Sequence, residues 1–206
     1  MIPRFITLEG GEGAGKSTQV KILTAHLAEA GLSVLKTREP GGSSGAEAIR
    51  DLLLNRSGWD PTAEMTLHFA ARREHWARSI QPSLAAGSWV VCDRFFDSTL
   101  AYQVGGQGAP RATWSALRAA TLGDATPDLT LLLDLPVAIG LKRAGQRGDT
   151  NRYDLLGVEF HQRIRDSFLS QAAAEPGRFA VINATAPLEM VSAAILDTCR
   201  QRFGLP

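Results

Sequence analysis

Apolar residues collect in five short runs along the chain. Three runs are continuous rather than alternating, FITL (5–8), WVVC (89–92) and LTLLLDL (129–135), and two weaker ones are SVLK (33–36) and FAVI (179–182). A strand that is apolar at every position is typical of a parallel sheet covered on both faces. We therefore expect five buried strands at these positions.

Longer stretches with helical spacing of apolar residues lie between the runs. They cover residues 16–30, 44–55, 62–86, 112–122, 137–146, 153–174 and 187–203. Strands that alternate with helices predict an α/β fold with a doubly wound parallel sheet of five strands. Loops rich in glycine or proline at 40–45, 104–110 and 145–151 follow residues with reactive side chains, so we expect them to face a ligand.

Length and charge narrow the class of protein. A chain of 206 residues fits one domain with at most a small mobile insert, and 44% apolar residues suffice for a substantial core. The 22 basic and 21 acidic residues leave a net charge of +1. Such a balance gives no overall attraction to nucleic acid or to a membrane surface, so any anion site must be local.

The cysteines and the N-terminal stretch favour the cytoplasm. Cys92 lies inside an apolar run, where a buried reduced thiol is expected, and Cys199 is too distant in sequence to suggest metal-ligand spacing. The stretch MIPRFITLEGG enters a strand pattern at once and lacks the apolar region of a signal peptide. No apolar run approaches the length of a membrane span.

A phosphate-binding loop follows the first predicted strand. The stretch GGEGAGKS (10–17) fits G-x-x-x-x-G-K-[ST] and stands between a strand and a helix, as that motif requires. Backbone N–H groups and the helix N-terminus would bind phosphate, Lys16 would reach the β and γ phosphates, and Ser17 would offer its hydroxyl to Mg²⁺. The expected ATP-binding positions here are Gly10, Gly11, Glu12, Gly13, Ala14, Gly15, Lys16, Ser17 and Thr18.

The rest of the chain favours phosphoryl transfer over other uses of a nucleotide. The N-K-x-D motif of GTPases is absent, and no strand ends in the Asp-Glu expected of a motor or transport ATPase. Arg38 and Arg94 each follow a predicted strand, where ligands of parallel sheets bind, and arginine is suited to a second phosphate. Asp93 precedes Arg94 and either holds Mg²⁺ through water or pairs with an arginine.

Pairs of residues four apart are candidates for binding a planar base. Phe69 and Arg73 share a helix face, so that one could stack on a ring and the other could recognise a carbonyl group. A core phenylalanine beside a surface arginine is the alternative, and the residues alone favour it. Ser98 and Tyr102 repeat the spacing, with Thr99 and Gln103 one position further along.

Several stretches together resemble the bacterial thymidylate kinase family. They are TREPGG (37–42), FAARR (69–73), DRFFDSTLAYQ (93–103), LTLLLDLP (129–136) and the arginine-bearing insert, and the likeness runs from Phe5 to the C-terminal helix. It implies the three-layer fold of P-loop nucleoside monophosphate kinases. It also implies phosphorylation of dTMP to dTDP by ATP in dTTP biosynthesis, with Mg²⁺ as cofactor, and a homodimer.

The resemblance implies a role for each matched position in dTMP binding. Phe69 stacks on thymine and Arg73 reads a thymine carbonyl, while Arg38 and Arg94 hold the phosphate. Glu12 accepts a hydrogen bond from the 3′-hydroxyl, which gives the carboxylate in a phosphate loop a purpose. The other positions are Pro40 near the base, Tyr102 against the ribose 2′ position, and Ser98, Thr99 and Gln103 around the base.

The insert at about 143–154 matches the lid that closes over ATP in this family. Gly13 stands where some eukaryotic relatives carry an arginine, so the resemblance implies that Arg147 is the catalytic arginine and that Arg143 and Arg152 assist it. An arginine that arrives on closure stabilises charge on the transferring group, and closure excludes water. Many relatives carry Leu-Asp-Arg where this chain reads TNR, which leaves open how Arg147 and Arg152 share the work.

Two other functions stay open at this point. A kinase for another small acceptor would phosphorylate dCMP, UMP or thymidine ahead of dTMP. A nucleotide-binding switch or assembly ATPase would turn over ATP without regard to dTMP, and the missing second acidic residue after the third strand speaks against it. The expected catalytic residues are Lys16, Arg147, Arg94 and Glu12, and the expected metal ligands are Ser17 and Asp93.

Overall fold

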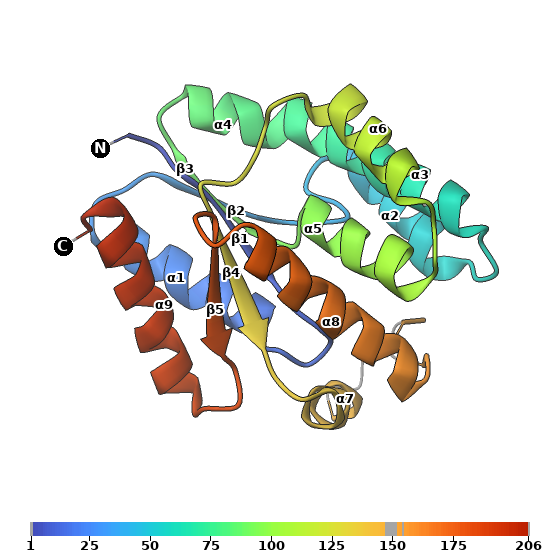
Figure 1. The fold of residues 1–206 in the computed structure, drawn as a ribbon. Coiled ribbons are helices and arrows are strands. Elements are labelled where there is room, and N and C mark those ends of the chain that lie inside the picture. Colours follow the sequence, from blue (N-terminus) through green and yellow to red (C-terminus); the bar gives the residue numbers. More distant parts are fainter. Residues whose placement is uncertain (1, 147–151, 154, 206) are drawn as a thin grey trace.

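The centre of the protein is a five-stranded parallel sheet (Figure 1). The computed structural model describes residues 2–146, 152–153 and 155–205. The strands are β1 (Phe5–Glu9), β2 (Val34–Arg38), β3 (Trp89–Asp93), β4 (Leu129–Asp134) and β5 (Phe179–Asn183), in the order β2-β3-β1-β4-β5. All five predicted strands are confirmed, and each begins and ends within two residues of its predicted limits.

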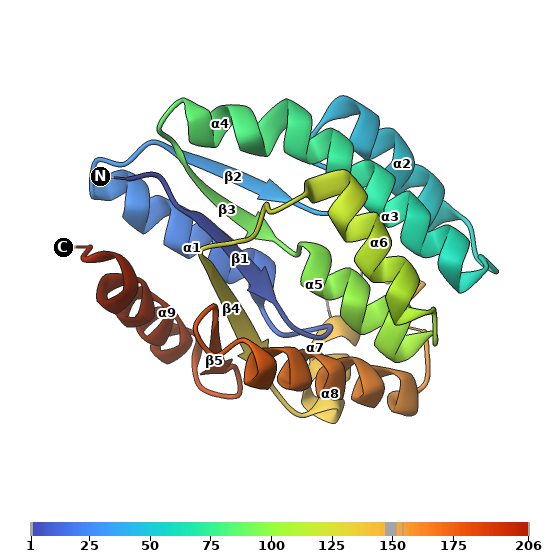
Figure 2. The same cartoon turned by 45° about the horizontal axis from the view of Figure 1, so that its top comes forward.

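Helices cover both faces of the sheet and complete a three-layer α/β fold (Figure 2). They are α1 (Lys16–Glu29), α2 (Ser44–Asn55), α3 (Pro61–His75), α4 (Gln81–Ala85), α5 (Phe96–Thr99), α6 (Arg111–Leu122), α7 (Val137–Gly145), α8 (Val158–Ala174) and α9 (Leu188–Phe203). Two π-helical segments, η1 (Trp76–Ile80) and η2 (Leu100–Gly106), continue α3 and α5.

The continuous apolar runs reflect cover on both faces. Successive strand residues point to opposite sides of a sheet. Ile6 and Leu8 of β1 pack in one cluster with α1 and α9, for example with Leu23. Phe5, which points the other way, packs in a second cluster that includes Phe69 of α3. No strand position of β1 faces water, and an alternating polar pattern is therefore absent from its sequence.

Two predicted limits are wrong, and both errors involve glycine. The loop expected from residue 104 is still helical as far as Gly106, where a Cβ would lie 2.6 Å from the ring of Phe160. This glycine serves close packing of η2 on α8 rather than a turn. The helix expected from residue 153 begins instead at Val158, because the preceding Gly157 is extended (φ −64°, ψ 159°).

The described residues agree with the expectation of buried thiols. Cys92 and Cys199 are free and buried, and burial raises the pKa of both thiols. Within the described ranges, no helix has the length and apolar character needed to cross a membrane.

Candidate functional site

The phosphate loop lies between the end of β1 and the start of α1. Gly15, directly before the helix, is left-handed (φ 89°), a conformation that a residue without Cβ adopts freely. Gly13 is left-handed as well (φ 69°), and a Cβ there would collide with the carbonyl oxygen of Gly140 in α7. The loop therefore turns tightly against α7 and leads into a helix N-terminus, the geometry that binds phosphate.

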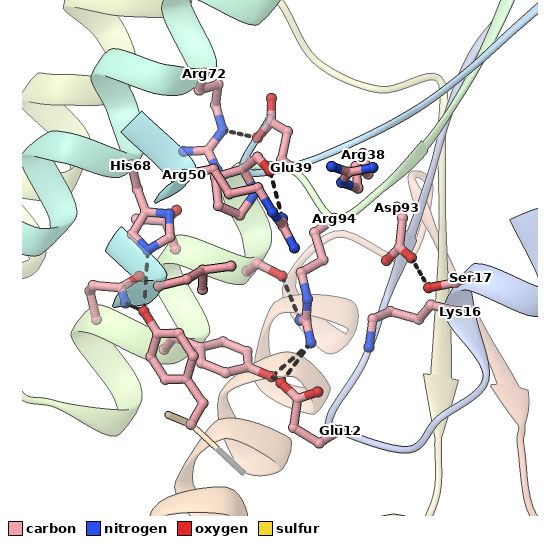
Figure 3. Close-up of a pocket in the computed structure, with 17 residues that line it drawn as sticks. Glu12, Lys16, Ser17, Arg38, Glu39, Arg50, His68, Arg72, Asp93 and Arg94 are labelled. Atoms are coloured by element: carbon pink, nitrogen blue, oxygen red, sulfur yellow. Dashed lines mark hydrogen bonds and ion pairs between the residues drawn. The ribbon is translucent and has the colours of Figure 1, made fainter. Parts of the chain in front are cut away.

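Lys16 and Ser17 open the first turn of α1. Nζ of Lys16 donates to two carbonyl oxygens of the loop, at 2.9 and 3.1 Å. Burial, together with the nearby charge of Arg94, lowers the pKa of Lys16 to about 8. Oγ of Ser17 donates to Oδ2 of Asp93 at 2.5 Å, so the expected metal-binding hydroxyl and carboxylate meet at one point (Figure 3).

A cavity of about 210 Å³ opens beside the loop, at the carboxyl ends of β1, β2 and β3 (Figure 3). The predicted residues in its wall are Glu12, Lys16, Ser17, Arg38, Pro40, Asp93, Arg94, Ser98, Thr99, Tyr102 and Gln103. The wall also contains Glu39, Arg50, Leu54, His68, Arg72 and Tyr153, for which the sequence predicted no role. Four arginines and a lysine suit this cavity to an anionic ligand.

Arg94 joins the phosphate loop to the helical segment that follows β3. Its Nη1 donates to the carbonyl oxygen of Gly10 (3.1 Å) and to Oγ of Ser98 (3.0 Å). Its Nη2 donates to Oε1 of Glu12 (3.0 Å) and to the hydroxyl of Tyr102 (2.9 Å). Burial alone would lower the pKa of Arg94, but Tyr102 and Glu12 raise it above its ordinary value, so this cation stays charged.

Glu9 supports Arg94 from behind the cavity. It is fully buried at the end of β1, where it accepts from the N–H group of Phe95 (2.7 Å) and from the hydroxyl of Ser98 (2.6 Å). Ser98 in turn accepts from Arg94. Burial raises the pKa of Glu9 from 4.5 to about 8, and the charge of Asp97 acts in the same direction.

The raised pKa of Glu9 predicts that the folded protein loses stability as pH rises. Between about pH 4.5 and 8 the folded chain retains a proton that the unfolded chain has released. The stabilisation is therefore fully present below about pH 4.5 and is lost as pH rises through about 8. Urea unfolding at pH 5 and pH 8 should show a larger loss for the wild type than for Glu9→Gln; equal losses would contradict the assignment.

Glu39 and Arg72 form a buried ion pair in another wall of the cavity. Nε of Arg72 lies 2.7 Å from Oε2 of Glu39, and both side chains are only 2% exposed. Nη2 of Arg72 donates to the carbonyl oxygen of Phe95 at 3.1 Å. No acceptor among the described residues reaches its Nη1. Buried donors are rarely left unpaired, so this N–H group needs a partner other than the described protein atoms, such as water or a ligand.

Arg38 and Arg50 approach the cavity from β2 and α2. Nη2 of Arg38 donates to both carboxylate oxygens of Glu47, at 3.1 and 3.0 Å, and this pair is largely exposed. Nη1 of Arg50 donates to the carbonyl oxygen of Pro40 at 2.7 Å. Arg38, Arg50 and Arg94 all line the cavity, and Figure 3 shows the end of Arg50 pointing towards Arg94, so the cavity holds three cations on this side.

The base-binding role expected for Phe69 and Arg73 needs correction. Phe69 is fully buried in the core, and Arg73 donates at the surface to the carbonyl oxygen of Thr121 (3.2 Å). Neither lines the cavity. The face of α3 that borders it carries His68 and Arg72, each one residue earlier (Figure 3). Burial lowers the pKa of His68 to about 3, so its ring is neutral.

The three arginines expected near ATP differ in their surroundings. Arg147 lies outside the described residues. Arg143 in α7 donates to the carbonyl oxygen of Ala184, after β5, at 2.9 Å. Arg152 pairs with the buried carboxylate of Glu64 at 2.7 Å. The structure therefore pairs Arg152 with α3, and the ATP contact expected for it stays a prediction.

Comparison with known proteins finds one family along most of the chain. A family model described as thymidylate kinase matches residues 8–195. The thymidylate kinase of Caulobacter vibrioides is 52% identical over 203 residues, which cover 98% of each chain. That of a Bradyrhizobium species is 50% identical over 97% of this chain and 91% of the relative. A crystal structure of thymidylate kinase from Ehrlichia chaffeensis is 33% identical, covers 95% of this chain and 98% of its own, and superposes with a TM-score of 0.80.

Proposed function

The chain belongs to the thymidylate kinase family, and from this premise we propose how its residues carry the γ-phosphoryl group of ATP to dTMP. Its reaction is ATP + dTMP → ADP + dTDP, a step towards dTTP. The sheet order and the structural likeness confirm the expected fold of P-loop nucleoside monophosphate kinases. One observation carries the assignment of the site: the phosphate loop with Lys16 opens onto the same cavity as Arg94 (Figure 3).

The phosphate of dTMP belongs at the end of the cavity where Arg38, Arg50 and Arg94 converge. Guanidinium groups bind phosphate through paired hydrogen bonds, and three of them offset its charge. Four hydrogen bonds hold both Nη groups of Arg94 in place, so Arg94 offers the phosphate its fixed charge and its remaining Nε–H group. Arg50 thus joins the two arginines expected from the sequence.

The base of dTMP belongs beside α3. The neutral ring of His68 offers a face for stacking, and the unpaired Nη1 of Arg72 supports a hydrogen bond to a thymine carbonyl. These two residues take the roles first expected of Phe69 and Arg73. The remaining residues around the base are Pro40, Ser98, Thr99 and Gln103.

The sugar belongs between Glu12 and Tyr102. Arg94 donates to Oε1 of Glu12 at 3.0 Å, so the carboxylate enters a phosphate site with its charge compensated. The hydroxyl of Tyr102 donates to the same oxygen at 2.8 Å. We assign the 3′-hydroxyl of dTMP to this carboxylate, and the crowding of the ribose 2′ position to Tyr102.

The donor belongs on the phosphate loop, residues 10–18, with Lys16 at the β and γ phosphates. The hydroxyl of Ser17 and the carboxylate of Asp93 fit Mg²⁺, which prefers oxygen ligands and takes few of them from the protein. When bound, Mg²⁺ supplies positive charge that neutralises the ATP phosphates. Thr18 and Arg143 complete the proposed ATP contacts.

Positioning and charge stabilisation are sufficient for the transfer. The phosphate of dTMP is largely ionised at neutral pH, so no side chain needs to remove a proton. Lys16 and Arg94 supply fixed positive charge on either side of the transferring group. We propose that residues of about 143–154 form a lid that brings Arg147 to the transferring group. We also propose that the whole chain is a single domain. Arg152 is proposed to assist Arg147.

A panel of acceptors tests the proposed site and separates its rivals. Coupled release of ADP should be fastest with dTMP among dTMP, dUMP, dCMP, UMP and thymidine. Faster turnover of dCMP, UMP or thymidine would indicate another acceptor. ATP turnover at the same rate with and without dTMP would indicate an ATPase.

Two neighbouring arginines give a matched test of the corrected base site. Arg72→Ala should lower kcat/KM for dTMP by at least about tenfold, because a buried hydrogen bond to an uncharged carbonyl and a charged pair are lost together. Arg73→Ala removes the same side chain one residue later and should stay within about twofold. Steady-state kinetics with melting curves distinguish the two; the opposite ranking would restore Arg73 as the base-reading residue.

Assembly and location are further proposals. We propose a homodimer with ATP and dTMP as its partners, as the family resemblance implies. We also propose a cytoplasmic location without nucleic acid or membrane partners, as the cysteines, the N-terminal stretch and the charge balance led us to expect. The near-neutral charge and the two buried free thiols support this proposal. Light scattering of the purified chain would measure the mass of the assembly directly.

A further inference from the structure

Glu64 is a buried carboxylate that does not line the cavity yet accepts from donors in two other segments of the chain. It lies in α3 and is 1% exposed. Its Oε1 accepts from Nε2 of Gln103 (2.8 Å), which lies within η2, and from Nε2 of Gln107 (3.0 Å), which directly follows η2. The same oxygen accepts from the hydroxyl of Tyr153 at 2.7 Å, and Oε2 lies 2.7 Å from Nη2 of Arg152.

The chemistry of a carboxylate dictates how these neighbours are oriented. An ionised carboxylate only accepts hydrogen bonds, so each neighbouring group must turn a donor towards it. The amide of Gln103 therefore directs its NH₂ group at Glu64. Gln103 also lines the cavity, and its carbonyl oxygen is the polar atom left for a ligand. Without Glu64 the side-chain amide of Gln103 could turn either its NH₂ group or its carbonyl oxygen towards the base. The contact with Glu64 holds the carbonyl oxygen on the side of the base.

The same carboxylate orients a second residue of the base site. Because the hydroxyl of Tyr153 donates to Glu64, its oxygen is the acceptor in its other contacts, with Nη2 of Arg152 at 2.8 Å and with Nε2 of His68 at 3.3 Å. Nε2 of His68 then carries the hydrogen. Nδ1 is left without one, and the neutral ring has a single tautomer. Glu64 thus determines which atoms of Gln103 and His68 donate and which accept. Both residues line the cavity, whereas Glu64 does not.

We propose that Glu64 is a positioning residue for base selection, which holds Gln103 as an acceptor for the N3–H group of thymine or uracil and against cytosine. The inference rests on the proposed placement of the base beside α3. Cytosine has no hydrogen on N3, so its lone pair would face the carbonyl oxygen of Gln103. A site built to accept from a ligand N–H group discriminates strongly against an analogue that lacks it.

The test compares dissociation constants of dTMP, dUMP and dCMP by calorimetry for the wild type and Glu64→Gln. A glutamine at position 64 both donates and accepts, so the amide of Gln103 is free to turn over. The preference for dTMP over dCMP should fall by about tenfold, the size of one hydrogen-bond discrimination. The dTMP to dUMP ratio should stay within about twofold, because both bases carry N3–H.

Two further variants keep the outcome decisive. Gln107→Met removes a donor from the same carboxylate oxygen without changing the cavity wall, and should leave the dTMP to dCMP ratio unchanged. Gln103→Met removes the acceptor itself, and should lose the preference even if Glu64→Gln fails to fold. Equal weakening of all three nucleotides in Glu64→Gln, or an unchanged preference in Gln103→Met, would overturn the inference. A wild type that does not prefer dTMP would instead overturn the proposed function.

Discussion

Replacing Lys16 by methionine is expected to lower kcat by about 10²- to 10³-fold, the usual cost of removing one fixed donor from a developing charge. Nζ of Lys16 is held by two loop carbonyl oxygens at the N-terminus of α1, where the β and γ phosphates of ATP are assigned. The KM for dTMP should change little, because the acceptor contacts lie with the arginines. Single-turnover kinetics at saturating ATP and dTMP measure the loss.

Methionine fills the space of the lysine stem, so folding should survive the change. Burial already lowers the pKa of Lys16 to about 8, which shows that its charge is costly in the free protein. The melting temperature of Lys16→Met should therefore be no lower than that of the wild type. Lys21→Met, at an exposed position of the same helix, is the matched control. A kcat within about threefold of the wild type would remove Lys16 from the mechanism.

Replacing Arg94 by alanine is expected to affect both activity and stability. The change removes the proposed phosphate ligand and leaves Glu12 with the hydroxyl of Tyr102 as its remaining partner of this cluster. Loss of a charged group that binds the phosphate is expected to cost about 3 kcal/mol of binding free energy, a fall of about 10²-fold in kcat/KM for dTMP. Breaking the pair with Glu12 separately lowers the free energy of unfolding, by about 3 kcal/mol. Urea unfolding should show a loss of stability of similar size.

A glycine at the same position separates the side chain from the backbone. Arg94 is left-handed (φ 70°), a conformation that alanine adopts no more readily and glycine adopts freely. Arg94→Gly should lose as much activity as Arg94→Ala, yet be about 1 kcal/mol more stable. Equal activity in Arg94→Gly and the wild type would show that the backbone turn, and not the guanidinium group, is what the reaction needs.

The elements of the fold could be predicted because their signals are local. A strand covered on both faces needs apolar residues at every position, and the runs at 5–8 and 89–92 carry that signal within four residues. The phosphate loop is equally local, because eight consecutive residues supply its backbone turns and its lysine. Helix limits were harder to predict, because a glycine in the sequence can serve different purposes. Gly106 allows close packing within a helical segment, whereas Gly157 is the extended residue before α8.

The face of α3 that borders the cavity could not be predicted from spacing. The pairs 68/72 and 69/73 are both four apart, so periodicity does not choose between them. A usable signal was the apolar pair Met65 and Phe69, which also lie four apart and mark the side that packs in the core. Once Phe69 is assigned to that side, Arg72 becomes the arginine to test.

Local chemistry thus specified the five strands, the phosphate loop and the arginines at the strand ends, because each depends on residues close together in the chain. Long-range packing specified the partners. Glu39 faces Arg72, Glu12 faces Arg94 and Glu64 faces Arg152 across 33, 82 and 88 positions of sequence. The sequence does not indicate which acidic residue pairs with which arginine. These pairings form only when the helices pack on the sheet, and the orientation of Gln103 follows from the position of Glu64.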